Sequence, residues 1–165
     1  MTHCLLLENL AGSLGGGLYS TWTTAAVTHC TMSGNAATGE GSYDLPNGGG
    51  LFSYRSELAF MNSILWRDEP NEVYVDPEAV GDPVFTHCDV QGGYPGVGNI
   101  DADPGFRSYA DFDCVLWPGS PCIDAAAGED DAIPWSRVHP AYGRHNLPVA
   151  DMGAYGGPGN LGWIR

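Results

Sequence analysis

The sequence contains no lysine, and its six basic residues are all arginines, against 20 aspartates and glutamates, for a net charge of −14. The absence of lysine excludes Schiff-base catalysis and the lysine of a phosphate-binding loop. The shortage of basic side chains argues against nucleic-acid partners and anionic membrane surfaces, because both require clustered lysine and arginine. No apolar run approaches the roughly 20 residues of a membrane span, and the N-terminal residues show no secretion-signal pattern.

Helical periodicity is also missing, because 24 glycines and 12 prolines interrupt the 165 residues too often for long helices. An apolar fraction of 43% and an aromatic fraction of 11% are nevertheless typical of a folded chain rather than a disordered one. We therefore expect a turn-rich protein of one-domain length that is built from short strands.

A tripeptide repeat organises the first hundred residues. Thr-His-Cys occurs at 2–4, 28–30 and 86–88, and Met-Asn-Ser at 61–63 is a degenerate fourth copy. The anchor positions of the four copies, which are 26, 33 and 25 residues apart, are Cys4, Cys30, Ser63 and Cys88. One short strand per repeat cannot bury its apolar face alone, so the repeats must stack on one another.

A second landmark confirms the repeat and locates an insertion. GGGLYS at 15–20 begins 11 residues after its cysteine, whereas GGGLFS at 48–53 begins 18 residues after its own. The difference of seven equals the excess of the second anchor spacing over the first, which places a seven-residue insertion between residues 35 and 48. Alternation over 27–32 predicts one strand with Thr28, Cys30 and Met32 on one face and His29 on the other.

The sequence resembles right-handed parallel β-helix proteins of the pectate-lyase-like superfamily, and more narrowly bacterial surface proteins with polymorphic-outer-membrane-protein repeats. The matching pieces are 28–35, 48–53, 62–67, 89–106, 116–125 and 151–157. The resemblance implies an all-β, right-handed parallel β-helix (solenoid) of about four coils over residues 1–106, closed by a C-terminal cap over 107–165. It also implies an extracellular or cell-surface location, in a superfamily that contains lyases, hydrolases and adhesins.

The chain opens directly on a repeat strand, without the polar capping unit that terminal repeats usually need. We therefore expect it to be the C-terminal portion of a longer protein. The uncapped first coil would present unpaired strand edges, through which copies of the chain could self-associate.

The five cysteines are an odd number, so at least one thiol stays unpaired. Cys4, Cys30 and Cys88, with Ser63 between them, are predicted to form an internal ladder of small buried side chains. Two alternatives remain open, namely a disulfide or soft-metal site at Cys4 and Cys30. A disulfide between the cysteines at 114 and 122 also remains open.

His3, His29 and His87 are predicted to form an outward row on an exposed sheet face, with Asn62 at the fourth position. Neighbouring imidazoles one strand spacing apart could share a transition-metal ion. The alternative is a surface residue that was copied when the repeat was duplicated.

Loops that leave the same strand of stacked repeats lie next to one another, which makes their carboxylates candidates for catalysis. The predicted catalytic residues are Asp44, Asp68 and Glu69, because glycoside hydrolysis needs two carboxyl groups about 5–9.5 Å apart. The predicted substrate-binding residues are Tyr43, Trp66, Arg67 and Tyr94, since aromatic rings stack on the apolar faces of sugars. The alternative is that these are solvated turn residues of an acidic protein.

Asn99, Asp101 and Asp103 alternate oxygen donors and form a possible Ca²⁺ site. They lie in a family-like closing segment, however, where such side chains cap turns. We interpret Asp124 and Asp151 in the same way, as carboxylates that accept backbone N–H groups. No cofactor is required by the sequence, although Ca²⁺ or a transition metal remains an option.

The favoured function is interaction with an extracellular polysaccharide, with hydrolysis left open. A polysaccharide lyase is disfavoured, because lysine is absent and the net negative charge would repel a polyuronate. The alternatives are a non-catalytic surface or adhesin-type passenger and a metal-binding solenoid that uses the histidine row.

Overall fold

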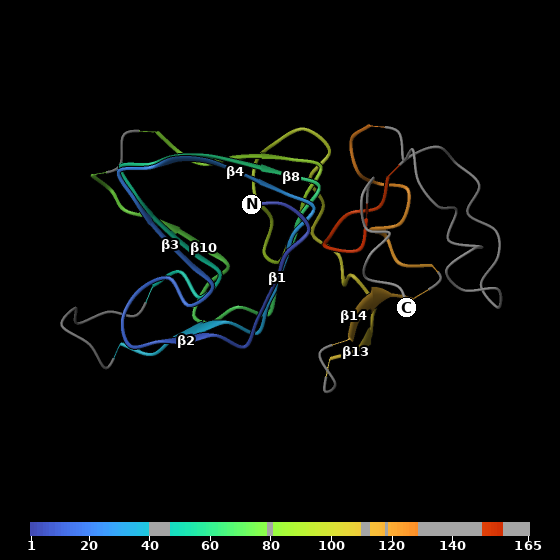
Figure 1. Cartoon of the computed structure of the whole chain (residues 1–165), viewed down its shortest axis with the longest axis horizontal. Helices are drawn as coiled ribbons and strands as arrows, with labels where there is room; N and C mark the ends of the chain where they lie inside the picture. The colour runs from blue at the N-terminus through green and yellow to red at the C-terminus, as the bar shows by residue number, and fades with distance from the viewer. Residues whose placement is uncertain (40–46, 79–80, 110–112, 118, 129–149, 157–165) are drawn as a thin grey trace.

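The computed structural model is all-β, as the sequence predicts, and describes residues 1–39, 47–78, 81–109, 113–117, 119–128 and 150–156. Within these residues no helix is present, so none is long and apolar enough to cross a membrane. Figure 1 shows the strands arranged as three sheets whose members overlie one another along the line of view.

Each of the three main sheets is parallel. The first contains β1 (Leu5–Leu7), β5 (Thr31–Ser33), β9 (Ile64–Trp66) and β12 (Asp89–Val90), in that order. The second contains β3 (Leu18–Thr21), β7 (Leu51–Tyr54) and β10 (Val73–Val75), and the third β4 (Thr24–Thr28), β8 (Glu57–Met61) and β11 (Val84–Thr86). A shorter parallel pair joins β2 (Leu10–Ala11) to β6 (Ala36–Ala37).

Strands that follow one another along the chain lie at one level of the three sheets, which we call a row. Row one runs from β1 to β4, row two from β5 to β8, row three from β9 to β11, and row four begins with β12. The register pairs Leu5 with Thr31, Thr31 with Ile64, and Ile64 with Asp89. The anchor residues immediately before these positions are therefore aligned, which confirms the predicted repeat.

The glycine-rich landmarks are aligned in the same way. Leu18 pairs with Leu51, so residues 15–17 lie beside residues 48–50, and backbone hydrogen bonds run from the first set to the second. The strands expected at LYS, LFS and VYV are present as β3, β7 and β10. The two sequence landmarks therefore fixed the order of the rows correctly.

Most corners between sheets contain one residue with left-handed backbone geometry. At the corner that enters the first sheet these residues are His3, His29, Asn62 and His87, with φ between 48° and 54°. The corner that leaves the first sheet uses Glu8, Gly34 and Arg67, and the corner after the second sheet uses Trp22 and Arg55. A left-handed residue reverses the side-chain alternation of a strand locally, and few side chains adopt it readily.

The corner at His29 corrects the predicted strand over residues 27–32. The chain forms β4 up to Thr28 and begins β5 at Thr31, with His29 at φ 48° between them. Val27, rather than Thr28, therefore shares the core with Cys30 and Met32. Simple alternation failed here because it assumes an extended backbone at every residue.

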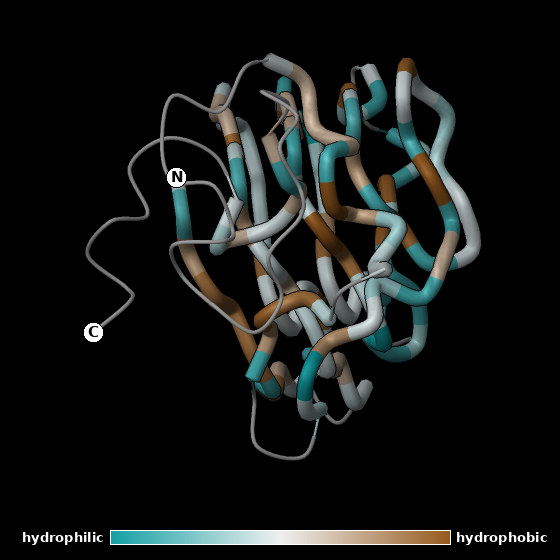
Figure 2. Tube along the Cα trace, turned by 90° about the vertical axis from the view of Figure 1, so that its right-hand side faces the viewer, coloured by the Kyte–Doolittle hydropathy of each residue, from teal (hydrophilic) through white to brown (hydrophobic). Residues whose placement is uncertain are grey.

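All three sheets contribute to one hydrophobic core. Its fully buried members include Val27, Met32, Leu51, Phe60 and Leu65. Figure 2 shows apolar segments of the chain recurring from one row to the next. Phe60 and Phe85, on neighbouring strands of the third sheet, stack with ring centroids 4.5 Å apart.

The cysteine ladder is present and consists of free thiols. Cys30 and Cys88 are buried and Cys4 is partly buried, and Ser63 between them accepts the Cys30 backbone N–H at 3.1 Å. Cys114 and Cys122 are also free and buried, so neither of the disulfides left open by the sequence is formed.

The C-terminal part packs on the outside of the first sheet. β13 (Phe106–Ser108) and β14 (Asp113–Leu116) form an antiparallel pair. Residues 150–156 then run along the sheet, where the Ala154 N–H donates to the Thr31 hydroxyl at 3.0 Å and the Gly153 N–H donates to the Asn62 carbonyl at 2.8 Å. A second core cluster, which contains Ile64, joins this part to the sheet.

Candidate functional site

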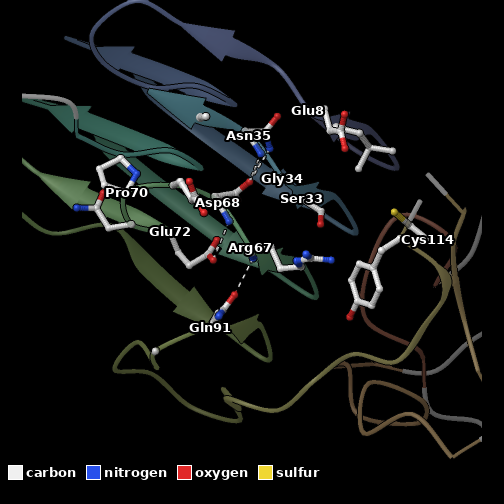
Figure 3. Close-up of a pocket in the computed structure, with 16 residues that line it drawn as sticks. Glu8, Ser33, Gly34, Asn35, Arg67, Asp68, Pro70, Glu72, Gln91 and Cys114 are labelled. Carbon is white, nitrogen blue, oxygen red and sulfur yellow. Dashed lines mark hydrogen bonds between the residues drawn. The ribbon is translucent and has the colours of Figure 1, made fainter. Parts of the chain in front are cut away.

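A groove of about 870 Å³ lies where the chain leaves the first sheet. One wall is the corner row Glu8, Gly34 and Arg67, and the other includes Tyr109 and Cys114 of the C-terminal part. Figure 3 shows this groove with Arg67 extending toward the side of Cys114, and Asp68 and Glu72 on the other side of Arg67. The volume is within the range of ligand-binding sites in proteins.

The groove floor is supported by a ladder of polar side chains, one from each of rows one to three. The side-chain oxygen of Asn35 accepts both the backbone and the side-chain N–H groups of Asn9, at 3.0 and 2.8 Å. Asp68 in turn accepts both equivalent N–H groups of Asn35, at 2.6 and 2.8 Å. Asn35 is fully buried, and these bonds satisfy groups that would otherwise be costly to bury.

The glycine landmark explains why this ladder fits inside the protein. A Cβ atom at Gly50 would lie 2.6 Å from the Oδ2 atom of Asp68, and one at Gly17 would lie 3.1 Å from the Asn35 side chain. Both glycines stand immediately before strands of the second sheet. The two motifs found in the sequence therefore meet in the interior, where the absence of a side chain on one makes room for the polar group on the other.

Asp68, the last residue of this ladder, forms an acid pair with Glu72. Asp68 is 5% exposed and Glu72 7% exposed, and the Asp68 backbone N–H donates to Glu72 Oε1 at 3.0 Å. Asp68 Oδ2 and Glu72 Oε2 are buried without a partner from any other described residue. The two side chains can hydrogen-bond to each other only when one carboxyl carries a proton.

Burial raises the pKa of both carboxyl groups, and the negative charge of Asp68 raises that of Glu72 further. The hydrogen bonds that Asp68 accepts from Asn35 favour its charged form and partly oppose the effect of burial. Glu72 is therefore the member that keeps its proton near neutral pH, and Asp68 the member that carries the charge.

The groove walls offer planar polar groups and one aromatic ring. Glu8, Arg67, Glu69 and Gln91 are exposed, and Arg67 is the only cation among the described residues that line the groove. The Arg67 guanidinium lies over the Tyr109 ring, 4.8 Å from its centroid, while its backbone N–H donates to Gln91 Oε1 at 2.7 Å. Carboxylate, amide and guanidinium groups beside an aromatic ring are suited to recognising hydroxyl-rich ligands.

The structure brings together three of the residues predicted from sequence, since Arg67, Asp68 and Glu69 all line the groove. Trp66 is half-buried and packs against the second core cluster, and Tyr94 packs on Phe85 with ring centroids 4.4 Å apart, away from the groove lining. Asp44 and Tyr43 lie outside the described residues. The catalytic and substrate-binding roles of all these residues stay predictions.

The expected exposed row of histidines does not hold at His29, which is only 7% exposed. Its ring stacks on His3 with centroids 5.1 Å apart, and Asn62 Nδ2 lies 3.1 Å from its Nε2 atom. Residues of the C-terminal part cover this corner, with the Ala154 carbonyl 3.3 Å from His3 Nδ1. Burial, and secondarily the nearby His3, lowers the pKa of His29 to about 4.

The residues of the candidate Ca²⁺ site take part in turns. Asn99 accepts the Cys88 N–H at 3.0 Å, Asp101 accepts the Gly92 N–H at 3.1 Å, and Asp103 accepts the Tyr109 hydroxyl at 2.6 Å. Asp151 likewise accepts the Asp124 N–H at 2.8 Å, which agrees with its interpretation as a structural carboxylate. Within the described ranges, no cluster of three or more His, Cys, Asp or Glu side chains is placed to hold a metal ion.

Sequence reasoning missed Glu72, which completes the acid pair, as well as Glu8, Gln91 and Tyr109. One signal pointed to the acid pair. Asp68 stands five residues after its anchor, where the earlier repeats have Asn9 and Asn35, and at this position Asn35 and Asp68 are both buried. No comparable signal marked Glu72, which lies at the end of a short excursion of the chain through Pro70.

Comparisons of the chain with protein-family models, with curated proteins and with solved structures find no match. The function of the groove must therefore be inferred from the chemistry of the residues that line it.

Proposed function

We propose that this chain is a right-handed parallel β-helix that binds a neutral polysaccharide in the groove beside the acid pair. The fold part of the proposal is supported by parallel pairing of successive rows in three sheets around one core. Connections between parallel strands are right-handed in nearly all proteins, which favours the right-handed form. An extracellular or cell-surface location follows from the resemblance of the sequence.

The observation that carries the functional part is the composition of the groove. Its exposed side chains Glu8, Arg67, Glu69 and Gln91 supply donors and acceptors in fixed planes, next to the Tyr109 ring. Sugar hydroxyl groups both donate and accept hydrogen bonds, and pyranose rings have apolar faces that pack on aromatic rings.

Charge selects for a neutral polymer. Two exposed carboxylates and a charged acid pair surround one arginine, in a chain whose net charge is −14. An anionic polysaccharide would meet repulsion that one guanidinium does not offset.

Hydrolysis of the bound polysaccharide is the second candidate, favoured by the proton that Glu72 retains near neutral pH. A general acid of a glycosidase must be protonated at its working pH. In this reaction the buried Glu72 side chain would first turn into the groove, and it would then give its proton to the glycosidic oxygen as the bond to the anomeric carbon breaks. A water molecule would add to that carbon and give a proton to the Glu69 carboxylate.

Binding is tested by retention on insoluble cellulose, xylan and mannan. We compare the wild-type chain with Glu69→Ala and Arg67→Asn, the latter chosen because asparagine tolerates a left-handed backbone. Each should weaken retention by about tenfold, which corresponds to about 1.4 kcal/mol. Glu57→Ala, which removes an exposed carboxylate from the third sheet, is the matched control and should bind like the wild type. Equal retention of all four proteins on every polymer would refute the proposal.

Hydrolysis is tested on the same polymers by release of reducing sugar, with absorbance at 235 nm to detect lyase products and with EDTA to detect a metal requirement. Glu72→Gln should abolish reducing-sugar release while leaving retention intact. Retention without any product would leave a non-catalytic surface protein, and loss of retention with EDTA would favour the metal-dependent alternative.

A further inference from the structure

A buried carboxyl group, that of Asp89, lies where the C-terminal part of the chain meets row four. Asp89 is the first residue of β12, and it pairs with Ile64 of row three. Its side chain is completely buried. Oδ1 accepts the Ala102 N–H at 3.2 Å, and Oδ2 accepts the thiol proton of Cys122 at 3.0 Å. One side chain of the first sheet therefore holds two separate segments of the C-terminal part.

No cation balances this carboxyl group, since within the described residues no basic side chain lies within ion-pair distance of it. The charged groups nearest to it are instead the carboxylates of Asp101 and Asp103. Burial raises the pKa of Asp89 to about 6, and the two neighbouring carboxylates add to the effect. The hydrogen bonds from Cys122 and Ala102 favour the charged form, but they do not offset the loss of solvation.

The other titratable groups around the contact do not supply a positive charge either. Its acidic neighbours lie on the sides of both segments, and they are Asp101, Asp103 and Asp151. Burial raises the pKa of the thiols of Cys88 and Cys122, which therefore keep their protons near neutral pH. Ionisation of Asp89 thus places a negative charge in a buried junction that already has negative charges around it.

The segment that Ala102 belongs to also carries one wall of the groove. Asp103, the next residue, accepts the Tyr109 hydroxyl at 2.6 Å, and the Arg67 guanidinium lies over the Tyr109 ring. Cys114 of the same wall packs with Cys122 in the second core cluster. Both segments held by Asp89 are therefore continuous with the groove wall that faces Arg67.

We propose that Asp89 is a proton-dependent latch, which holds the C-terminal wall of the groove against the first sheet and loosens as its carboxyl group ionises. When the wall is released Asp89 is solvated, and a solvated aspartate has a pKa of about 4. The pKa in the closed state is higher, so the contribution of the latch to closure is fully present below about pH 4 and is lost as the pH rises toward 6. An effect of the latch on a bound polysaccharide rests on the function proposed for the groove, whereas the latch itself does not.

Hydrogen exchange followed by mass spectrometry tests the latch without any ligand. Protection factors, which correct for the intrinsic pH dependence of exchange, are compared between pH 4 and 7 for residues 100–109, for residues 119–126 and for β8. Asp89→Asn removes the charge and keeps an oxygen acceptor. Glu57→Gln, which removes an exposed carboxylate from β8, is the matched control. Cys122→Ser is the second variant if Asp89→Asn does not fold, because a hydroxyl group donates to a charged carboxylate more strongly than a thiol.

In the wild type we expect the protection of both C-terminal segments to fall about ten- to a hundredfold more than that of β8 between pH 4 and 7. Asp89→Asn should abolish this difference, Cys122→Ser should reduce it, and Glu57→Gln should leave it unchanged. No difference between the C-terminal segments and β8 in the wild type would overturn the latch, because a local release would then be absent. A full difference that persists in Asp89→Asn would overturn the assignment to Asp89.

The connection to the groove is tested by adding cellohexaose, xylohexaose or mannohexaose, with binding verified by calorimetry. A ligand that contacts both walls favours the closed state, so it should raise the protection of the two C-terminal segments at pH 7 by mass action. Unchanged protection in the presence of a bound hexasaccharide would overturn the coupling of the latch to the groove. Failure of the wild type to bind any of the polymers would overturn the groove proposal, whereas the exchange measured without ligand decides the latch.

Discussion

Replacing Glu72 by glutamine should remove a pH dependence of stability that the acid pair creates. Burial and the charge of Asp68 raise the pKa of Glu72 well above that of an exposed glutamate. The folded protein therefore keeps a proton that the unfolded chain releases above about pH 5. The contribution of Glu72 to the free energy of unfolding is fully present below the pKa of Glu72 in the unfolded chain. It is lost as the pH rises toward the pKa of Glu72 in the folded protein, by about 1.4 kcal/mol per pH unit.

Comparison of the wild type with Glu72→Gln from pH 6.5 to 8 isolates this effect. In the folded protein His29 is already neutral and the buried thiols keep their protons, and the titration of His29 and of the thiols in the unfolded chain is the same in both proteins. We expect the wild type to lose about 2 kcal/mol more than Glu72→Gln across the interval, or about 4–8 °C in Tm. The amide still offers Oε1 to the Asp68 N–H and an N–H group to the Asp68 carboxylate.

The assay is urea unfolding followed by tryptophan fluorescence at half-unit steps of pH. Glu57→Gln is the matched control, because it removes an exposed carboxylate on β8 and should keep the wild-type slope. Identical slopes in the wild type and in Glu72→Gln would show that the pair does not hold a proton in the folded state.

Three further predictions concern stability and reactivity. His29→Asn, which copies Asn62 at the equivalent corner, should reduce the loss of stability between pH 6.5 and 4 by about 2–3 kcal/mol. The reason is that folded His29, with a pKa of about 4, does not take up the proton that the unfolded chain binds. The same decrease in urea midpoint from pH 7 to pH 4.5 in the variant and the wild type would contradict this. Gly50→Ala should destabilise by about 1–3 kcal/mol, since the new methyl group would lie 2.6 Å from Asp68 Oδ2; an unchanged thermal midpoint would show that the ladder has room to shift. Titration with Ellman's reagent should modify Cys4 first and the four buried thiols only after unfolding; two or more fast thiols would count against the packed cysteine ladder.

The sequence contained enough to predict the rows but not their corners. The cysteine anchors and the glycine hexapeptides show the same seven-residue excess in the second repeat, which determined which residues lie side by side, and the pairing of Leu18 with Leu51 confirms it. The left-handed residue at each corner is not encoded by a single residue type, since histidine, asparagine, arginine, glutamate and tryptophan all occur there. Such a backbone state is imposed by the surrounding sheets, so alternation along a short segment could not reveal it.

The groove was predicted in part, because the repeat places equivalent loops next to one another. Arg67, Asp68 and Glu69 follow a strand end, and the stacking of loops correctly placed them together. The burial of Glu72 could not be inferred, because it is an acidic residue without a repeat counterpart, in a segment that reads as a solvated turn. Tyr109 comes from a distant part of the chain, and a wall built by such packing leaves no local pattern in the sequence.

The polar ladder has a direction, and this limits how the protein can be extended or rearranged. Each asparagine side chain donates an N–H group to the next residue of the ladder, and its oxygen can accept one from the residue before. Asparagine can therefore follow asparagine in any number of successive rows. Asp68 accepts hydrogen bonds from Asn35 but has no side-chain N–H group to donate to a following row, so the ladder ends at Asp68. Repeats with asparagine could be added or deleted ahead of Asp68 without altering the bonding scheme, whereas a repeat placed after it would need a different residue. The single change from amide to acid thus encodes the position of a repeat within the array, and it puts the only proton-holding pair of the ladder at its end.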